Sequence, residues 1–128
     1  MNIEGSKILI TGGSSGIGKA TAQLLTNKGA TVVITGRDSD KLTAVAKEIN
    51  AIPLVFDIAQ SDTITEKSAE AISLLGGIDV LINNAGIGEF GLLEEITLDQ
   101  FERVFSTNVF GLAMLTQAIV PHLKAAGK

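Results

Sequence analysis

The sequence contains no cysteine and no tyrosine, and it has one histidine among its 128 residues. Without cysteine the protein can form neither disulfides nor thiolate metal sites, which is compatible with a reducing compartment. The single histidine, His122, lies near the end of the last expected helix, where its charge would favour the helix dipole. We expect no metal site. Without tyrosine, no phenol can serve as a general acid or base.

Positive charge and long apolar runs are also scarce. Ten basic residues stand against 14 acidic ones, for a net charge of −4. A surface of this sign repels phosphate backbones, so we expect no nucleic-acid partner. The first residues resemble no secretory signal. The longest apolar run, Val109 to Val120, is shorter than the ~20 residues that a membrane span needs. We therefore expect a soluble, cytoplasmic protein without a membrane contact.

The most informative stretch is a glycine-rich segment after a short apolar run. Residues 8–10 are all apolar, which is typical of a strand buried on both faces. The next eight residues include four glycines, and a helix should follow and end at Gly29. We expect this helix to carry one stripe made of Ile17, Ala20, Leu24 and Lys28.

Such a turn between a strand and a helix is suited to binding an anion. Glycine lets a phosphate approach the backbone closely, because no Cβ stands in the way. The first amides of the helix are unpaired and lie at the positive end of its dipole, so a pyrophosphate fits there. Ser14 and Ser15 can add hydroxyl donors.

The spacing of the glycines separates several phosphate-binding patterns. Gly13 to Lys19 is almost a P-loop, but Ala20 stands where Ser or Thr should hold Mg²⁺. The general G-x-G-x-x-G fingerprint fails because Thr21 takes the place of its third glycine. An ordinary turn with glycines for packing is a further alternative. The pattern that fits is T-G-x-x-x-G-I-G, formed by Thr11, Gly12, Gly16, Ile17 and Gly18. It resembles the short-chain dehydrogenase/reductase family.

Strands and helices alternate along the rest of the chain. Further strands are expected at residues 32–35, 54–56 and 80–82, with helices between them. Thr97 and Gln100 form a capping box for a last helix, which Pro121 should kink near its end. The face of this helix should consist of Phe101, Phe105, Asn108, Leu112, Leu115 and Ile119. We expect one domain, residues 1–128, with a Rossmann-like α/β fold. Its three α/β/α layers should hold a parallel sheet in strand order 3-2-1-4.

Polar residues at the ends of the second and third strands point to the adenosine part of a dinucleotide. Arg37 follows the second strand, where an arginine accommodates the 2′-phosphate of NADP and a carboxylate would favour NAD. We therefore expect NADP(H) in preference to NAD(H), although a solvated surface arginine is the alternative. Asp57 and Ile58 follow the third strand. The resemblance implies that Asp57 meets the adenine amino group, and the alternative is a turn residue.

Two further motifs strengthen the resemblance. N-N-A-G, residues 83–86, follows the fourth strand, and the resemblance implies that Asn83, Ala85 and Gly86 lie at the cofactor. N-V-x-G begins at Asn108 and matches the active-site asparagine of the family, which helps organise a proton-relay water. A turn and a hydrogen-bonded core asparagine are the respective alternatives.

The resemblance covers the first half of the family's domain only. Members of the family continue into a catalytic serine and a Tyr-x-x-x-Lys motif, which this sequence does not contain. We expect a truncated cofactor-binding half of an oxidoreductase for carbonyl or alcohol substrates, inactive alone. A non-catalytic nucleotide-binding or assembly module is the alternative. The mean hydropathy of +0.37 is high, and uncovered apolar surface favours a homo-oligomer.

Overall fold

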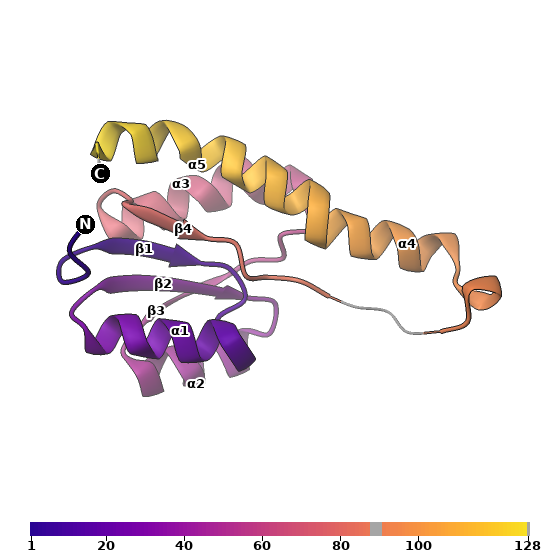
Figure 1. Ribbon diagram of the computed structural model, residues 1–128, viewed down its shortest axis with the longest axis horizontal. Helices are drawn as coiled ribbons and strands as arrows, with labels where there is room; N and C mark the ends of the chain where they lie inside the picture. Colours follow the sequence, from indigo (N-terminus) through magenta and orange to yellow (C-terminus); the bar gives the residue numbers. More distant parts are fainter. Residues whose placement is uncertain (88–90, 128) are drawn as a thin grey trace.

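A four-stranded parallel sheet forms the centre of the protein. The computed structural model describes residues 1–87 and 91–127. The strands are β1 (Lys7–Ile10), β2 (Thr31–Gly36), β3 (Ile52–Val55) and β4 (Val80–Ile82), paired in the order β3-β2-β1-β4. Helices α1 (Gly16–Asn27) and α2 (Ser39–Ile49) cover one face, and α3 (Ile64–Leu75) and α5 (Leu112–Ala126) cover the other (Figure 1). The expected three-layer fold and strand order are confirmed.

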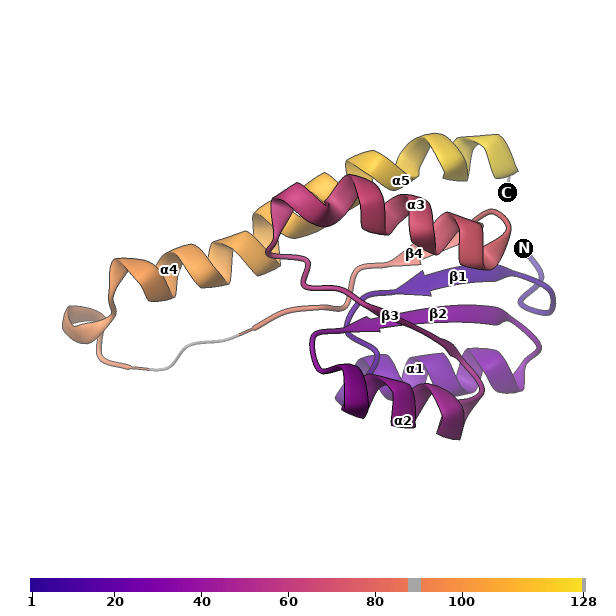
Figure 2. The ribbon, with the colours of Figure 1, turned by 180° about the vertical axis from the view of Figure 1, so that it is seen from behind.

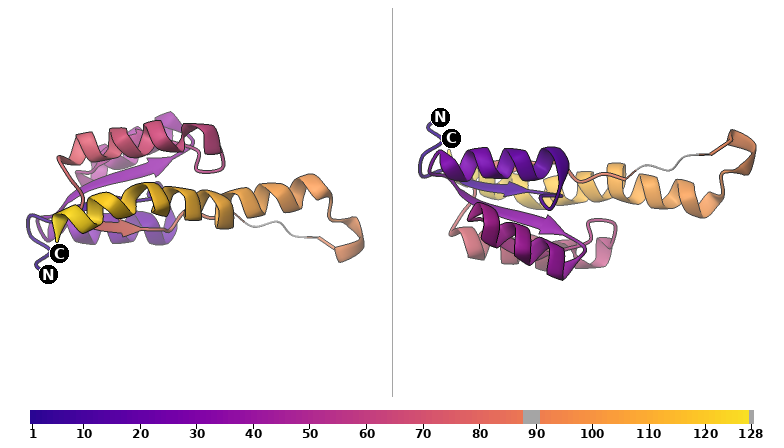
Figure 3. Two further views of the ribbon diagram at one scale, coloured as in Figure 1. Left: turned by 90° about the horizontal axis from the view of Figure 1, so that it is seen from above. Right: turned by 90° about the horizontal axis from the view of Figure 1, so that it is seen from below.

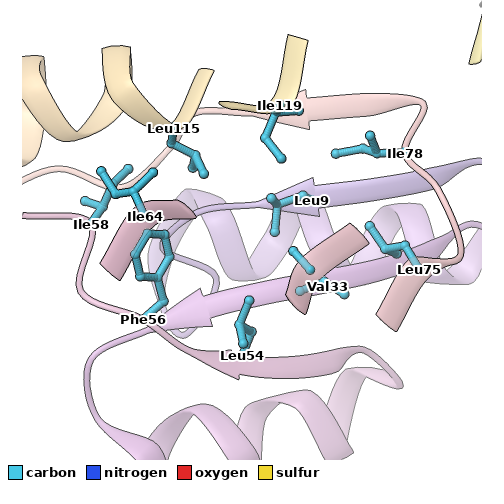
Figure 4. Close-up of a cluster of buried hydrophobic side chains, with 11 residues drawn as sticks. Leu9, Val33, Leu54, Phe56, Ile58, Ile64, Leu75, Ile78, Leu115 and Ile119 are labelled. Carbon is cyan, nitrogen blue, oxygen red and sulfur yellow. The ribbon is translucent and has the colours of Figure 1, made fainter. Parts of the chain in front are cut away.

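Alternate residues of the central strands point to opposite faces of the sheet and pack into two separate hydrophobic cores. Leu9 of β1 and Val33 of β2 point toward α3 and α5 and meet Leu115 and Ile119 there (Figure 4). Their neighbours in the same strands point to the opposite face and pack with α1 and α2, as Ile8, Ile10, Val32 and Ile34 do. Because both faces are covered, these strands have no solvent side, which explains their unbroken apolar sequence.

The expected stripe of α1 lies on the wrong side of the helix. Ile17 is 80% exposed and Leu24 is 55% exposed, whereas the buried residues are Gly18 and Ala22. At Gly18 the helix lies so close to the glycine turn that no side chain fits between them, whereas the larger Leu25, which was not part of the expected stripe, packs partly buried against the core. The 3.6-residue pattern of apolar residues therefore predicts the wrong face of α1, because the close contact at Gly18 requires a small residue whatever its hydrophobicity.

The last helix is longer than any other in the protein. Helix α4 (Leu98–Phe105) continues through a π-helical segment (Ser106–Gly111) into α5, which passes Pro121 and ends at Ala126. The predicted capping box is present: Thr97 Oγ1 accepts from the Gln100 amide at 3.2 Å, and Gln100 Oε1 accepts from the Thr97 amide at 2.8 Å. The amino-terminal part of this helix extends well beyond the sheet (Figures 2 and 3).

The projecting part of this helix leaves its apolar side chains exposed. Of the predicted apolar face, Leu115 and Ile119 are buried, whereas Phe101 and Phe105 are exposed, so only the carboxyl-terminal half of the face packs on the rest of the protein. The whole helix, Leu98–Ala126, spans 29 residues, and 22% of its most apolar 18-residue segment is buried. By length and composition alone it could cross a membrane, which the shorter run considered in the sequence did not suggest. One such helix is a weak indication.

Candidate functional site

Thr11 joins the carboxyl ends of β1 and β4. Its side chain is buried, and its Oγ1 accepts hydrogen bonds from the backbone amides of Asn84 at 3.1 Å and Ala85 at 3.0 Å. The Thr11 amide donates to the Ile82 carbonyl at 3.1 Å. The first residue of the glycine motif therefore fixes the N-N-A-G segment against the glycine turn, so the two motifs form one structure.

Asn84 and Gly18 close this structure from either side. The Asn84 Nδ2 donates to the Gly12 carbonyl at 2.8 Å. A Cβ placed on Gly18 would lie 2.1 Å from the same carbonyl oxygen and 2.4 Å from Asn84 Nδ2. Only glycine at position 18 thus allows α1 to begin directly under the hydrogen-bonded turn. By contrast, the predicted Asn83 turns toward α5, where its Nδ2 donates to Thr116 Oγ1 at 3.0 Å.

The glycine turn is also attached to β2. Thr35 Oγ1 accepts from the Gly12 amide at 3.2 Å, and the Thr35 carbonyl accepts from the Gly13 amide at 2.9 Å. Gly12 has a φ of +74°, a conformation that glycine adopts without strain. Thr35 was not identified in the sequence, because a threonine at the end of a β-branched run is typical of any strand.

The amino terminus of α1 lies next to this turn. Within residues 1–87 and 91–127, the N-cap Ser15 makes no capping hydrogen bond with its side chain, and no acidic residue lies in the first turn. The first amides of a helix have no partner inside the helix and carry partial positive charge. This end of α1 can therefore accept an anion, with the Ser14 and Ser15 side chains beside it.

A cavity of about 640 Å³ lies at the carboxyl ends of the strands. It brings together these predicted residues: Gly12, Ser14, Ser15, Arg37, Asp57, Ile58, Ala85 and Gly86. The other predicted residues, Gly16, Ile17, Gly18, Asn83 and Asn108, are not among those that line it. Several lining residues were missed in the sequence: Thr35, Gly36, Asp38, Lys41, Phe56, Asn84, Ile87 and Thr107. Of these, Asn84 could have been found, since it belongs to N-N-A-G.

Two cations and one carboxylate lie where the cavity meets β2 and α2. The Asp38 carboxylate caps α2, accepting from the amides of Asp40 at 3.1 Å and Lys41 at 3.2 Å. In the part of the chain that the structure describes, the side chains of Arg37 and Lys41 have no ion-pair or hydrogen-bond partner. This corner of the cavity can therefore receive a further anion.

The loop after β3 provides the wall of the cavity beside Arg37. Asp57 Oδ1 accepts from the Ala59 amide at 3.0 Å, so this carboxylate does stabilise a turn. Its other oxygen has no hydrogen-bond partner among the described residues. Ile58 and Phe56 are buried and reach the cavity from the same loop. Phe56 and Ile58 thus give this wall an apolar surface beside the Asp57 carboxylate.

Asn108 connects the π-helical segment to the loop after β4. Its Oδ1 accepts from the Ile87 amide at 2.9 Å, and its Nδ2 donates to the Ile87 carbonyl at 2.8 Å. The neighbouring Thr107 is only 6% exposed and lines the cavity. The predicted amide of Asn108 thus has its partners in the backbone of Ile87, next to the cavity. π-helical segments are frequent at functional sites.

The residues that line the cavity offer anion-binding groups and apolar surface. Within the described ranges, no three His, Asp or Glu side chains come together in a way that could hold a metal ion. The sequence has no tyrosine. In the described part of the chain, a glycine turn, a helix amino terminus, the unpaired Arg37 and Lys41 side chains and an apolar wall all open on one cavity.

Comparisons with known proteins agree with this geometry. The family model for short chain dehydrogenases matches residues 6–128. A 3-oxoacyl-(acyl-carrier-protein) reductase of Thermotoga maritima is 36% identical over 128 residues, which cover 96% of this chain and 52% of the relative. The chain therefore spans about half the length of the curated relatives it matches.

Two solved structures extend the likeness to the fold. A 3-ketoacyl-(acyl-carrier-protein) reductase of Brucella melitensis, complexed with NADH, superposes with a TM-score of 0.92 and 36% identity, over 98% of this chain and 53% of that one. A metagenomic short-chain oxidoreductase in complex with NADP gives a TM-score of 0.90 and 34% identity, over 98% of this chain and 60% of that one. A nicotinamide cofactor is common to both.

Proposed function

The chain belongs to the short-chain dehydrogenase family, and we propose that it is the NADP(H)-binding half of an oxidoreductase acting on carbonyl or alcohol substrates. The observation that carries this proposal is the cavity at the carboxyl ends of β1, β2 and β4, into which the glycine turn opens. Open parallel sheets bind their ligands at this position. When bound, the nicotinamide would supply or accept the hydride.

The residues of the glycine turn suit the pyrophosphate of the cofactor. Glycine is needed at positions 12 and 18 for internal packing, since a Cβ there would lie 2.9 Å from Ala85 Cα and 2.1 Å from the Gly12 carbonyl oxygen. At Gly16 the space around a Cβ is open among the described residues, so a phosphate could approach the backbone there. Amides at the start of α1, around Gly16 and Ile17, would donate to phosphate oxygens, because they have no partner inside the helix. The hydroxyls of Ser14 and Ser15 would add further donors.

The adenine and its ribose would occupy the wall formed by the loops after β3 and β4. We assign Asp57 to the adenine amino group, with Ile58, Ala85 and Gly86 around the ring and ribose. Asn83 would act indirectly. Its hydrogen bond to Thr116 anchors the start of N-N-A-G to α5 and so positions the residues that follow.

Arg37 is the basis for expecting NADP(H) rather than NAD(H). Its guanidinium lines the cavity without a partner among the described residues, and a bidentate arginine–phosphate contact is a strong one. Titration calorimetry should show NADP⁺ binding more tightly than NAD⁺, by roughly 10-fold or more. Arg37→Met should remove most of that difference, whereas Lys28→Met, at the far end of α1, should leave it unchanged. Equal binding of NAD⁺ and NADP⁺ by the unmodified chain would refute the preference.

We propose that the 128-residue chain binds the cofactor but does not turn over substrate. The family's serine and Tyr-x-x-x-Lys motif have no counterpart in it, and Asn108, as organiser of a proton-relay water, cannot supply the proton alone. A carbonyl-reductase assay with NADPH is the direct test, and turnover by this chain would contradict the proposal. Cofactor binding without turnover would also fit a non-catalytic nucleotide-binding module. Adding the carboxyl-terminal half of a relative would separate the two readings.

We further propose that the chain associates with itself. The exposed apolar side chains of the long helix include Phe105, Val109, Phe110 and Met114, and a patch of this kind is typical of an interface. Multi-angle light scattering of the 128-residue chain should give a mass above the 13.3 kDa of one copy. A monodisperse monomer would argue against association. Separately, we propose a cytoplasmic location, with which a sequence without cysteine is compatible.

A further inference from the structure

The cavity is positively charged at one corner, although the protein as a whole carries a net charge of −4. Three charged residues line this corner: Arg37, Asp38 and Lys41. The Asp38 carboxylate faces the start of α2 and accepts two backbone hydrogen bonds there. Its negative charge is thus already balanced in part by the helix dipole. Among residues 1–87 and 91–127, the side chains of Arg37 and Lys41 have no such partner, so the corner favours an anion.

Lys41 differs from the other lysines of the chain in its surroundings. Lys19 pairs with Glu48 at 3.1 Å, Lys67 pairs with Glu70 at 3.4 Å, and Lys7 donates to the Gly76 carbonyl at 2.7 Å. Lys28, Lys47 and Lys124 are not among the residues that line the cavity. Among the described lysines, Lys41 alone combines an unpartnered ammonium with a place on the main cavity.

The backbone of Lys41 is fixed at the mouth of the cavity. Its amide donates to Asp38 Oδ1 at 3.2 Å, as part of the cap that begins α2. The residue therefore starts from a rigid first turn, four positions after Arg37, with its long side chain on the cavity side. A lysine ammonium is a mobile point charge, and an arginine is a planar fork, so the two complement each other around one phosphate.

We propose that Lys41 is a second specificity-determining residue, which shares the ribose phosphate of the cofactor with Arg37. The inference rests on the proposed function, because it assigns a role within the same site. A phosphomonoester carries a charge near −2 at neutral pH, so one arginine leaves part of this charge unbalanced. Lys41 balances it. The ligand chemistry is a phosphate on an adenosine ribose, at either the 2′ or the 3′ position.

Binding of small adenosine phosphates to the 128-residue chain tests this role without any turnover. The probes are 2′,5′-ADP, 3′,5′-ADP and 5′-AMP, and their affinities are measured by titration calorimetry. The proteins compared are the unmodified chain, Lys41→Met and the control Lys47→Met. Lys47 lies on the same helix but does not line the cavity. Lys41→Met should weaken 2′,5′-ADP by about 10-fold, as expected for a lost charge-assisted hydrogen bond. It should change 5′-AMP by less than about 2-fold. Lys47→Met should change neither, and Lys41→Arg should restore most of the loss.

The outcomes separate the inference from the function it rests on. If the unmodified chain prefers 2′,5′-ADP and Lys41→Met does not weaken it, the role of Lys41 is wrong and the cofactor proposal stands. If 5′-AMP weakens equally, Lys41 acts on the 5′-phosphate or on the fold, and the inference also fails. Tighter binding of 3′,5′-ADP would identify a 3′-phosphorylated ligand and overturn NADP(H). If none of the three nucleotides binds, both proposals fall.

Discussion

Replacing Gly18 by alanine is expected to abolish nucleotide binding and to destabilise the protein by about 3 kcal/mol, near the upper end for overpacking in a rigid region. The new Cβ would lie 2.1 Å from the Gly12 carbonyl oxygen and 2.4 Å from Asn84 Nδ2. These two atoms are joined by a hydrogen bond of 2.8 Å, so neither can move without breaking the contact between the glycine turn and N-N-A-G. Calorimetric titration with NADP⁺ and urea unfolding measure the two effects.

Gly16, a second glycine of the same turn, provides the control for the stability measurement. Gly16 has a φ of +56°, but beyond its own chain neighbours and helix backbone no atom of the described residues lies within 4 Å of the position of its Cβ. Gly16→Ala therefore adds only the cost of a left-handed conformation, about 1 kcal/mol. If Gly18→Ala were no more destabilising than Gly16→Ala, the close contact with Gly12 would not be limiting, and the account of the turn given above would be wrong.

The regular parts of this fold were predictable because each is encoded locally. The apolar run at residues 8–10 indicated a strand covered on both sides, and the Thr97–Gln100 capping box marked the start of α4. The strand order followed once the glycine motif had suggested the family. Helix α1 was harder. Its buried face consists of small residues, so the apolar periodicity pointed to the opposite, exposed side.

The part of the site that could not be predicted depends on contacts between distant segments. Thr11 and Asn84 are 73 residues apart and meet only because β1 and β4 are neighbours in the sheet. Thr107 lies in an apolar helical stretch, and nothing in its sequence context distinguishes it from an ordinary helix residue. Lys41 was hidden among solvent-exposed lysines, and only the placement of α2 brings it to the cavity. Motifs therefore predicted the glycine turn, and the fold was needed to find the surrounding residues that line the cavity.

Gly111→Ala should destabilise the protein by about 2–3 kcal/mol, although helix propensity predicts the opposite. Gly111 has φ −61° and ψ −45°, where alanine normally stabilises a helix by about 1 kcal/mol relative to glycine. Its Cβ would, however, lie 2.4 Å from the Ile58 carbonyl oxygen and 2.8 Å from that of Ser106. The backbone of Ile58 belongs to the loop that walls the cavity, so relief of the clash displaces this loop. Urea unfolding measures the loss.

The sign of this change decides between local and tertiary control of the long helix. If propensity governed, Gly111→Ala would be as stable as the unmodified chain or more so, and its affinity for NADP⁺ would be unchanged. If the contact with Ile58 governs, stability and affinity fall together, because one displacement of the loop causes both losses. Gln117→Ala, at an exposed position of α5, is the matched control and should shift the free energy of unfolding by less than about 0.5 kcal/mol. Gly111 then marks the point where the long helix packs against the loop after β3.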